Sequence, residues 1–254
     1  LKSVNKSISN PIDYYSNNVC GTVILIEVMK KFGCKTFIFS SSATVYGEPK
    51  SVPISEDFPL SSLNPYGHSK LIIEDLLKNI CDSDSAWSIA ILRYFNPIGA
   101  HKSGMIGENP IGLPNNLMPY ISQVAIGKRE KLYIFGDNFK TSDGTGVRDY
   151  IHVMDVVDGH ISAFKAIRDN NKLLILNLGT GKGYSVLEVV SAFENASGKK
   201  IPIQIVDRRA GDVSECFANP SLAFDLIKWK SKRELDEMCE DSWRWQRLNP
   251  NGYN

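Results

Sequence analysis

The sequence predicts an α/β protein in which buried parallel strands alternate with amphipathic helices. Apolar and β-branched runs cover residues 36–41, 88–95 and 173–179, and helix-like segments lie between them. Polar residues follow directly where the first two runs end. In open sheets of this kind ligands bind outside the carboxyl ends of the strands. The polar residues at these ends are therefore candidate site residues.

Capping and turn residues predict the other elements. We expect helices over residues 10–33, from near Tyr66 onward, over 116–126 and over 155–167, and core-packing helical spacing over 235–245. Short strands are expected over 132–135 and 147–153. Ser185 and Glu188 form a predicted capping box for a helix that Gly198 ends. We interpret the glycine-rich residues 179–183 as a strand-to-helix turn, because they lack the spacing of a phosphate-binding loop.

Composition excludes several classes of function. The 254 residues carry a net charge of +1, with 43% hydrophobic and 22% charged residues, which is typical of a globular protein. Because positive and negative charges are nearly balanced, we expect no nucleic-acid or membrane partner. No apolar run approaches the ~20 residues of a membrane span. The five cysteines and four histidines show no metal-ligand spacing, so we expect no metal and a cytoplasmic protein with reduced thiols.

Tyr66 and Lys70 are the strongest catalytic candidates. They lie four residues apart on one predicted helical face. A phenol has a pKa near ~10, and a neighbouring cation lowers that pKa by stabilising the phenolate. Tyr66 could then act as a general acid and base beside Ser42. The spacing alone favours a core tyrosine and a solvated lysine.

A family resemblance changes that balance. The serine run followed by Tyr-x-x-x-Lys resembles the catalytic set of the extended short-chain dehydrogenases/reductases. The sequence is similar to that of the UDP-glucose 4-epimerase family at residues 40–47, 64–70, 93–101 and 115–120, and the similarity extends along essentially the whole chain.

The resemblance implies an incomplete Rossmann-type, doubly wound parallel sheet with a smaller α/β substrate-binding domain. Residues 1–97 would be the remaining half of the dinucleotide-binding domain. Residues 98–254 would bind the UDP-sugar, with a segment near 147–180 returning to the sheet. Compared with the family, the sequence starts roughly two and a half βαβ units further along the fold, at ~30 residues per unit. The glycine-rich turn that holds the cofactor pyrophosphate in the family is absent from the sequence.

The resemblance also implies NAD as cofactor and assigns residues to it and to a UDP-sugar. The residues assigned to NAD are Lys2, Asn17, Ser42, Tyr66, Lys70 and Phe95. Those assigned to the UDP-sugar are Ser42, Tyr66, Asn96, Asn116, Leu117, Tyr133, Phe135, Arg148, Tyr150, Arg209, Asp212 and Cys216. Guanidinium groups at 148 and 209 suit a diphosphate, although surface salt bridges explain them equally well from sequence alone.

The implied reaction is epimerisation at C4 of UDP-galactose and UDP-glucose. Cys216, where many bacterial relatives carry tyrosine, frees volume beside the sugar and predicts that UDP-GlcNAc and UDP-GalNAc are also substrates. The family usually forms homodimers through the helix before the serines and the Tyr66 helix.

Two alternatives remain open. A nucleotide-sugar 4,6-dehydratase would share the Tyr-Lys pair, but it would need an acid and a base where this sequence has Ala43 and Thr44. The chain could instead be a UDP-sugar-binding fragment without catalytic activity, because the pyrophosphate loop is absent from the sequence.

Overall fold

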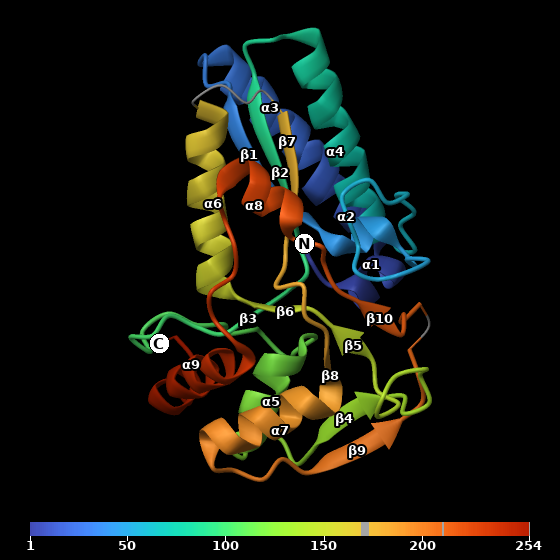
Figure 1. The fold of residues 1–254 in the computed structure, drawn as a ribbon, viewed down its shortest axis with the longest axis vertical. Coiled ribbons are helices and arrows are strands. Elements are labelled where there is room, and N and C mark those ends of the chain that lie inside the picture. Colours follow the sequence, from blue (N-terminus) through green and yellow to red (C-terminus); the bar gives the residue numbers. More distant parts are fainter. Residues whose placement is uncertain (169–172, 210, 254) are drawn as a thin grey trace. The chain divides into compact units, whose positions relative to one another are not determined.

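The computed structural model describes residues 1–168, 173–209 and 211–253. They divide into two compact units (Figure 1). Unit 1 comprises the described residues of Leu1–Tyr94, Asp158–Leu178 and Asn219–Trp229, and unit 2 those of Phe95–Val157, Gly179–Ala218 and Lys230–Asn254.

Unit 1 is built on a parallel three-stranded sheet. Its strand order is β1 (Thr36–Ser42), β2 (Ser88–Tyr94) and β7 (Leu173–Leu178). Ile91 lies opposite Phe39 on one side and Ile175 on the other, so apolar side chains line up across one face. The prediction of three buried parallel strands is confirmed, each ending within one residue of its expected bound.

Helices cover both faces of this sheet. The helical elements of unit 1 are α1 (Val4–Ser9), α2 (Pro11–Tyr14), the π-helix η1 (Tyr15–Cys20), α3 (Gly21–Lys31), the 3₁₀ helix η2 (Ala43–Tyr46), α4 (Pro65–Ser83), α8 (Ser221–Ile227) and the later part of α6 (Val153–Arg168). Ile26 of α3 and Ile73 and Leu77 of α4 pack into the core on one face. On the other face α8 contacts β7, and His160 of α6 reaches Tyr94 of β2.

Local sequence explains the start of α4. The Asn64 side chain caps it by accepting a hydrogen bond from Gly67 N at 2.9 Å, and Pro65 takes the first helical position, where no N–H is needed. The helix predicted over residues 10–33 is present as α2, η1 and α3. Gly33, with φ +68°, follows its end as expected of a terminating glycine.

Unit 2 combines short strand pairs with three helices. β3 (Asn96–Ile98) pairs with β6 (Tyr150–His152) and β4 (Leu132–Phe135) with β9 (Ile203–Val206), both parallel. β5 (Val147–Arg148) lies between β10 (Glu215–Cys216) and β8 (Tyr184–Ser185). The helices α5 (Leu117–Ala125), α7 (Val186–Ser197) and α9 (Leu235–Leu248) surround a core that includes Ile121, Phe193 and Met238.

The predicted capping box is confirmed at the start of α7. Ser185 Oγ accepts from Glu188 N at 3.0 Å, and the Glu188 carboxylate accepts from Ser185 N at 2.7 Å. Gly198 ends the helix with φ +66°. None of the helices formed by the described residues is both long and apolar enough to cross a lipid bilayer.

The single strand predicted over 147–153 is wrong in its extent. Asp149 separates β5 from β6, and α6 begins at Val153 instead of Asp155. The reason is a change of backbone partner. Asp149 N donates to Cys216 O at 3.0 Å, whereas Asp149 O accepts from Asn96 N at 2.9 Å. The chain therefore leaves one strand pair and enters another at this residue.

Candidate functional site

Three consecutive serines end β1, and each hydroxyl has a different partner. The Tyr94 hydroxyl donates to Ser40 Oγ at 2.8 Å. Ser41 Oγ donates to Glu74 Oε1 at 2.5 Å. Ser42 Oγ accepts hydrogen bonds from the first turn of η2. The serines thus connect the end of β1 to β2, to α4 and to η2.

Tyr66 lies in the first turn of α4, with Ser42 within hydrogen-bonding reach of its hydroxyl. Burial raises the pKa of Tyr66 because it disfavours the phenolate. The hydrogen bond with Ser42 opposes this rise, and the neighbouring Tyr14, whose ring centroid is 6.5 Å away, adds to it. The structure therefore brings the predicted acid/base and its hydroxyl partner together.

Lys70 lies one turn further along α4. Its Nζ donates to Ser40 O at 2.9 Å and lies 5.8 Å from the centroid of the Tyr66 ring. Burial lowers the pKa of Lys70, since the ammonium loses hydration. The sequence predicted that this ammonium would lower the pKa of Tyr66. In the structure burial instead moves the two pKa values in opposite directions, that of Tyr66 upward and that of Lys70 downward.

Glu74 continues the same helical stripe and was missed from sequence. It follows Lys70 by four residues, is fully buried, and forms an ion pair with buried Arg93 of β2 at 2.6 Å. Arg93 NH1 also donates to the Tyr46 hydroxyl at 2.9 Å, which donates to Asn177 Oδ1 at 2.7 Å. This buried network joins α4, β2, η2 and β7 beneath the catalytic candidates. The sequence signal that could have identified Glu74 was an acidic residue two helical turns after Tyr66, inside an apolar run.

The residues assigned to NAD in the first 20 positions lie on the surface of unit 1. Lys2 and Asn17 are exposed. Asn17 belongs to the π-helix η1 and donates to Asn18 Oδ1 at 2.9 Å. Asn18, which sequence reasoning missed, is buried and donates to Ser69 Oγ at 3.1 Å, next to Lys70. The sixth assigned residue, Phe95, is buried in unit 2.

In unit 2 four of the predicted substrate residues meet at neighbouring strand ends. Arg148 lies opposite Cys216 in the β5–β10 pair, and Asn96 lies opposite Tyr150 in the β3–β6 pair. Burial raises the pKa of Cys216 to about 11, so the thiol stays neutral at pH 7. Burial also raises the pKa of Tyr150 to about 12, although Arg148 and Arg209 lower it through their charges.

Arg209 lies in a second group of predicted residues. Its Nε is 3.0 Å from Asp212 Oδ2, and its guanidinium carbon lies 4.5 Å from the centroid of the Phe135 ring. Tyr133 is exposed two residues before Phe135 on β4. The charge of Arg209 also lowers the pKa of Tyr150, which belongs to the strand-end cluster.

Asn116 and Leu117 have local roles in the structure. The exposed Asn116 precedes α5, and its Nδ2 donates to Glu108 Oε1 at 3.2 Å. Leu117 packs against the core of unit 2. Among the interactions of the described residues, neither side chain contacts Arg148 or Arg209.

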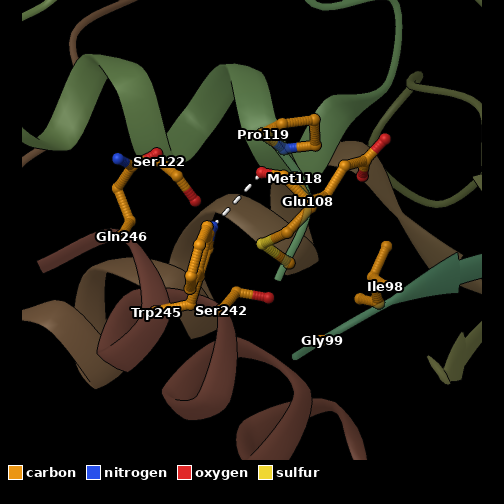
Figure 2. A pocket seen from close by; sticks show the side chains of 9 residues that line it. All are labelled: Ile98, Gly99, Glu108, Met118, Pro119, Ser122, Ser242, Trp245 and Gln246. Atoms are coloured by element: carbon orange, nitrogen blue, oxygen red, sulfur yellow. Dashed lines mark hydrogen bonds between the residues drawn. The ribbon is translucent and has the colours of Figure 1, made fainter. Parts of the chain in front are cut away.

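A small pocket of about 20 Å³ lies between α5 and α9 in unit 2, with room for one water molecule (Figure 2). Its lining residues are Ile98, Gly99, Glu108, Met118, Pro119, Ser122, Ser242, Trp245 and Gln246. The Trp245 indole N–H donates to the Glu108 carbonyl at 3.3 Å. Since the lining includes none of the residues assigned to the UDP-sugar, this pocket is not the predicted site.

Comparison with known sequences points to one group of enzymes. A family profile described as GDP-mannose 4,6 dehydratase matches residues 1–242. The UDP-glucose 4-epimerase of Bacillus subtilis (strain 168) is 56% identical over 253 residues, covering 100% of this chain and 75% of that protein. The Homo sapiens UDP-glucose 4-epimerase is 55% identical over 254 residues, covering 100% of this chain and 73% of that protein.

Comparison with solved structures agrees. The UDP-glucose 4-epimerase from Bifidobacterium longum, in complex with NAD+ and UDP, superposes with a TM-score of 0.96 at 49% identity. The alignment covers 100% of this chain and 76% of that one. The enzyme from Stenotrophomonas maltophila, with bound NAD and formylated UDP-arabinopyranose, also gives 0.96 at 47% identity, covering 98% and 74%.

Proposed function

This chain belongs to the UDP-glucose 4-epimerase family of extended short-chain dehydrogenases/reductases, and on that basis we propose that it interconverts UDP-galactose and UDP-glucose by an NAD-dependent reaction at C4. The observation that carries the proposal is the arrangement at the end of β1. Ser42 lies there within hydrogen-bonding reach of the Tyr66 hydroxyl, and the Lys70 ammonium donates to the adjacent Ser40 carbonyl.

The donor groups of unit 1 fit the nicotinamide riboside end of NAD. Lys70 and Tyr66 present an ammonium and a hydroxyl on one helical face at the carboxyl end of a parallel strand, where α/β sheets bind such ligands. When bound there, NAD would supply the acceptor and donor for the hydride at C4. Lys70 would hold the cofactor ribose, and we assign Lys2, Asn17 and Phe95 to the same cofactor.

The chemical work of the protein is proton transfer. Tyr66 takes the proton of the sugar 4-hydroxyl as the hydride leaves C4, and gives it back when the hydride returns. Ser42 hydrogen-bonds the reacting oxygen and orients it. Burial raises the pKa of Tyr66, and we assign to the Lys70 ammonium the task of favouring the phenolate against that rise.

Unit 2 supplies the groups for the nucleotide. We assign the diphosphate to Arg148 and Arg209, because planar guanidinium groups donate paired hydrogen bonds to phosphate oxygens. Asp212, already bonded to Arg209, would accept from the ribose. The remaining residues assigned to the UDP-sugar in this unit are Asn96, Asn116, Leu117, Tyr133, Phe135, Tyr150 and Cys216.

Cys216 supports a wider substrate range. Its neutral thiol lies half-buried opposite Arg148 and is smaller than a tyrosine ring. We therefore infer that the enzyme also interconverts UDP-GlcNAc and UDP-GalNAc, with the N-acetyl group using the volume beside Cys216.

The dehydratase alternative lacks its acid and base. The description of the matching family profile names a dehydratase, but the relatives at 55–56% identity over the whole chain are epimerases. At the strand end, Ala43 is buried and Thr44 bonds to Ser42, and neither side chain can transfer the protons of a dehydration.

The finer assignments of domain, assembly and location are proposals that the family resemblance supports. We propose that unit 1 belongs to the dinucleotide-binding domain and that unit 2 binds the UDP-sugar. A homodimer would form through α3 and α4. Ile24, Leu25 and Val28 expose apolar surface on α3, which supports an interface there. We propose a cytoplasmic location.

The test is conversion of UDP-galactose by the purified protein with added NAD, followed by proton NMR of the sugar signals. The proposal predicts appearance of UDP-glucose, and loss of that activity in Tyr66→Phe. Retained UDP binding without any conversion would instead support the UDP-sugar-binding alternative.

A further inference from the structure

Asp149 has a fully buried carboxylate that gathers donors from distant parts of unit 2. Its Oδ1 accepts from Thr180 N at 2.8 Å and from the Thr180 hydroxyl at 2.7 Å. Its Oδ2 accepts from Gly181 N and from Ala218 N, both at 3.1 Å. One side chain therefore fixes the turn at residues 179–181 and the segment that follows β10.

The backbone of Asp149 is bonded to two of the predicted substrate residues. Its N–H donates to the Cys216 carbonyl at 3.0 Å, and its carbonyl accepts from Asn96 N at 2.9 Å. Arg148, assigned to the diphosphate, precedes it, and Arg148 NH1 donates to the Val147 carbonyl at 2.8 Å. Displacement of Asp149 would move all three substrate residues.

Gly179 explains how the turn comes so close. A Cβ atom at this position would lie 2.5 Å from Asp149 Oδ2 and 2.5 Å from the Ala218 Cβ atom, shorter than any tolerated contact. The Gly-Thr-Gly sequence at 179–181 thus has a specific task. It wraps two backbone N–H groups and one hydroxyl around a carboxylate of this chain, as a phosphate-binding turn would around a phosphate.

We propose that Asp149 is the positioning residue of the nucleotide-sugar site: its carboxylate, clamped by the 179–181 turn and Ala218, holds Arg148, Cys216 and Asn96 in their binding geometry. This inference rests on the proposed function, since it assumes that these three residues bind the UDP-sugar. Asp149 acts through its neighbours and not by touching the substrate.

Asp155 offers a matched control. It is also fully buried in unit 2, and its Oδ2 accepts from the N–H groups of Lys232 and Arg233 at 3.0 Å each. Its partners lie in the segment before α9, away in sequence from the residues assigned to substrate. Asp155 Oδ1 also forms an ion pair with Arg233 NH1. Asp155→Asn therefore disturbs a carboxylate of similar burial without removing any of the donors that hold Asp149.

The experiment compares Asp149→Asn and Asp155→Asn for UDP affinity by calorimetry, KM and kcat with UDP-galactose, and thermal midpoint. An amide at 149 must turn its NH₂ toward N–H donors, so we expect the Kd of UDP and the KM to rise about tenfold or more, with kcat within about threefold of wild type. We expect Asp155→Asn to lower the thermal midpoint while leaving the Kd of UDP within about twofold.

An unchanged Kd of UDP in Asp149→Asn, or equal losses in both variants, would overturn the inference. Wild-type protein that binds no UDP would overturn the proposed function as well, whereas wild-type binding with an unaffected Asp149→Asn removes only the inference. If Asp149→Asn does not fold, the Thr180→Val variant tests the inference instead. Loss of one hydroxyl donor should raise the Kd of UDP about threefold with little change in thermal midpoint, and no change would overturn the inference.

Discussion

Glu74 and Arg93 form a two-point ion pair, with 3.0 Å between Arg93 Nε and Glu74 Oε1 and 2.6 Å between Arg93 NH2 and Glu74 Oε2. Both side chains are almost fully buried. Because Glu74 shares a helical face with Tyr66 and Lys70, the pair fixes the rotation of α4 about its axis. It thereby sets where the catalytic side chains point.

Glu74→Gln should be strongly destabilising. Loss of the carboxylate leaves the Arg93 guanidinium buried without a counter-charge, which costs about 3–5 kcal/mol of unfolding free energy. Urea unfolding measures this change. We also expect kcat to fall, because α4 loses its anchor on β2.

Asp75→Asn is the matched control for this change. Asp75 is the next residue on α4, but it is exposed and pairs with Lys78 at 3.1 Å on the surface. Its loss should cost less than about 1 kcal/mol. Equal costs for the two variants would contradict the anchoring role of Glu74.

Tyr66→Phe should lower kcat by about three orders of magnitude or more, since it removes the only group proposed to transfer the 4-hydroxyl proton. UDP binding should stay within about twofold of wild type, because the diphosphate residues are unchanged. Steady-state kinetics and calorimetry measure the two effects. Near-normal turnover would exclude Tyr66 as the acid and base.

Cys216→Tyr should narrow the substrate range. The added ring would occupy the volume assigned to the N-acetyl group, so conversion of UDP-GalNAc should be lost while conversion of UDP-galactose remains. NMR assays with both substrates measure the ratio. A Cys216→Ser control keeps the small volume and should convert both; retained UDP-GalNAc activity in Cys216→Tyr would refute the specificity role.

His152 predicts a pH dependence of stability. It is buried, its Nδ1 accepts from Met154 N at 3.0 Å, and its Nε2 lies 3.2 Å from Asp241 Oδ2. Burial lowers the pKa of His152, and the hydrogen bond with Asp241 opposes the shift. The unfolded chain, with a histidine pKa near ~6.5, therefore binds a proton more readily than the folded chain.

The unfolding free energy should consequently fall as the pH drops from about 7.5 to 5.5, because the unfolded state binds more protons there. The His152 contribution is fully present above the unfolded pKa and is lost as the pH falls through it toward the folded pKa. Urea unfolding across this range measures the slope. His152→Gln should flatten the slope, and an unchanged slope would contradict the role of His152.

The proposed dimer is tested on α3. Ile24→Glu combined with Val28→Glu places charges on its exposed apolar face and should give a monomer by light scattering. Lys31→Glu at the end of the same helix is the control and should keep the dimer. A wild-type monomer would remove the proposal.

The sequence predicted best where the signal is local. The capping box of Ser185 and Glu188 spans four residues, and both of its hydrogen bonds are present. The strands β1, β2 and β7 each contain an apolar run. By contrast, β8 and β10 contain two residues each and exist through their pairing with β5, which no local pattern reveals.

The site followed the same rule. One helical turn separates Tyr66 and Lys70, so the sequence placed them on one helical face, and the family resemblance then favoured them as catalytic residues. Glu74 and Arg93 are 19 positions apart, and Asp149 and Ala218 are 69 apart. Neither pair carries a sequence signal of its own. Their partnership arises from the sheet register and from the turn that carries Gly179.

The three serines at the end of β1 look interchangeable, yet the protein would not tolerate the loss of any one of them by deletion. Because strand side chains alternate between faces, shortening the run by one residue would turn every side chain after the gap to the opposite face. Two serines would remain at the positions of Ser40 and Ser41, but Ala43 would stand where Ser42 does, and Tyr66 would lose the hydroxyl beside it. The number of serines in the run therefore matters as well as their hydroxyl chemistry.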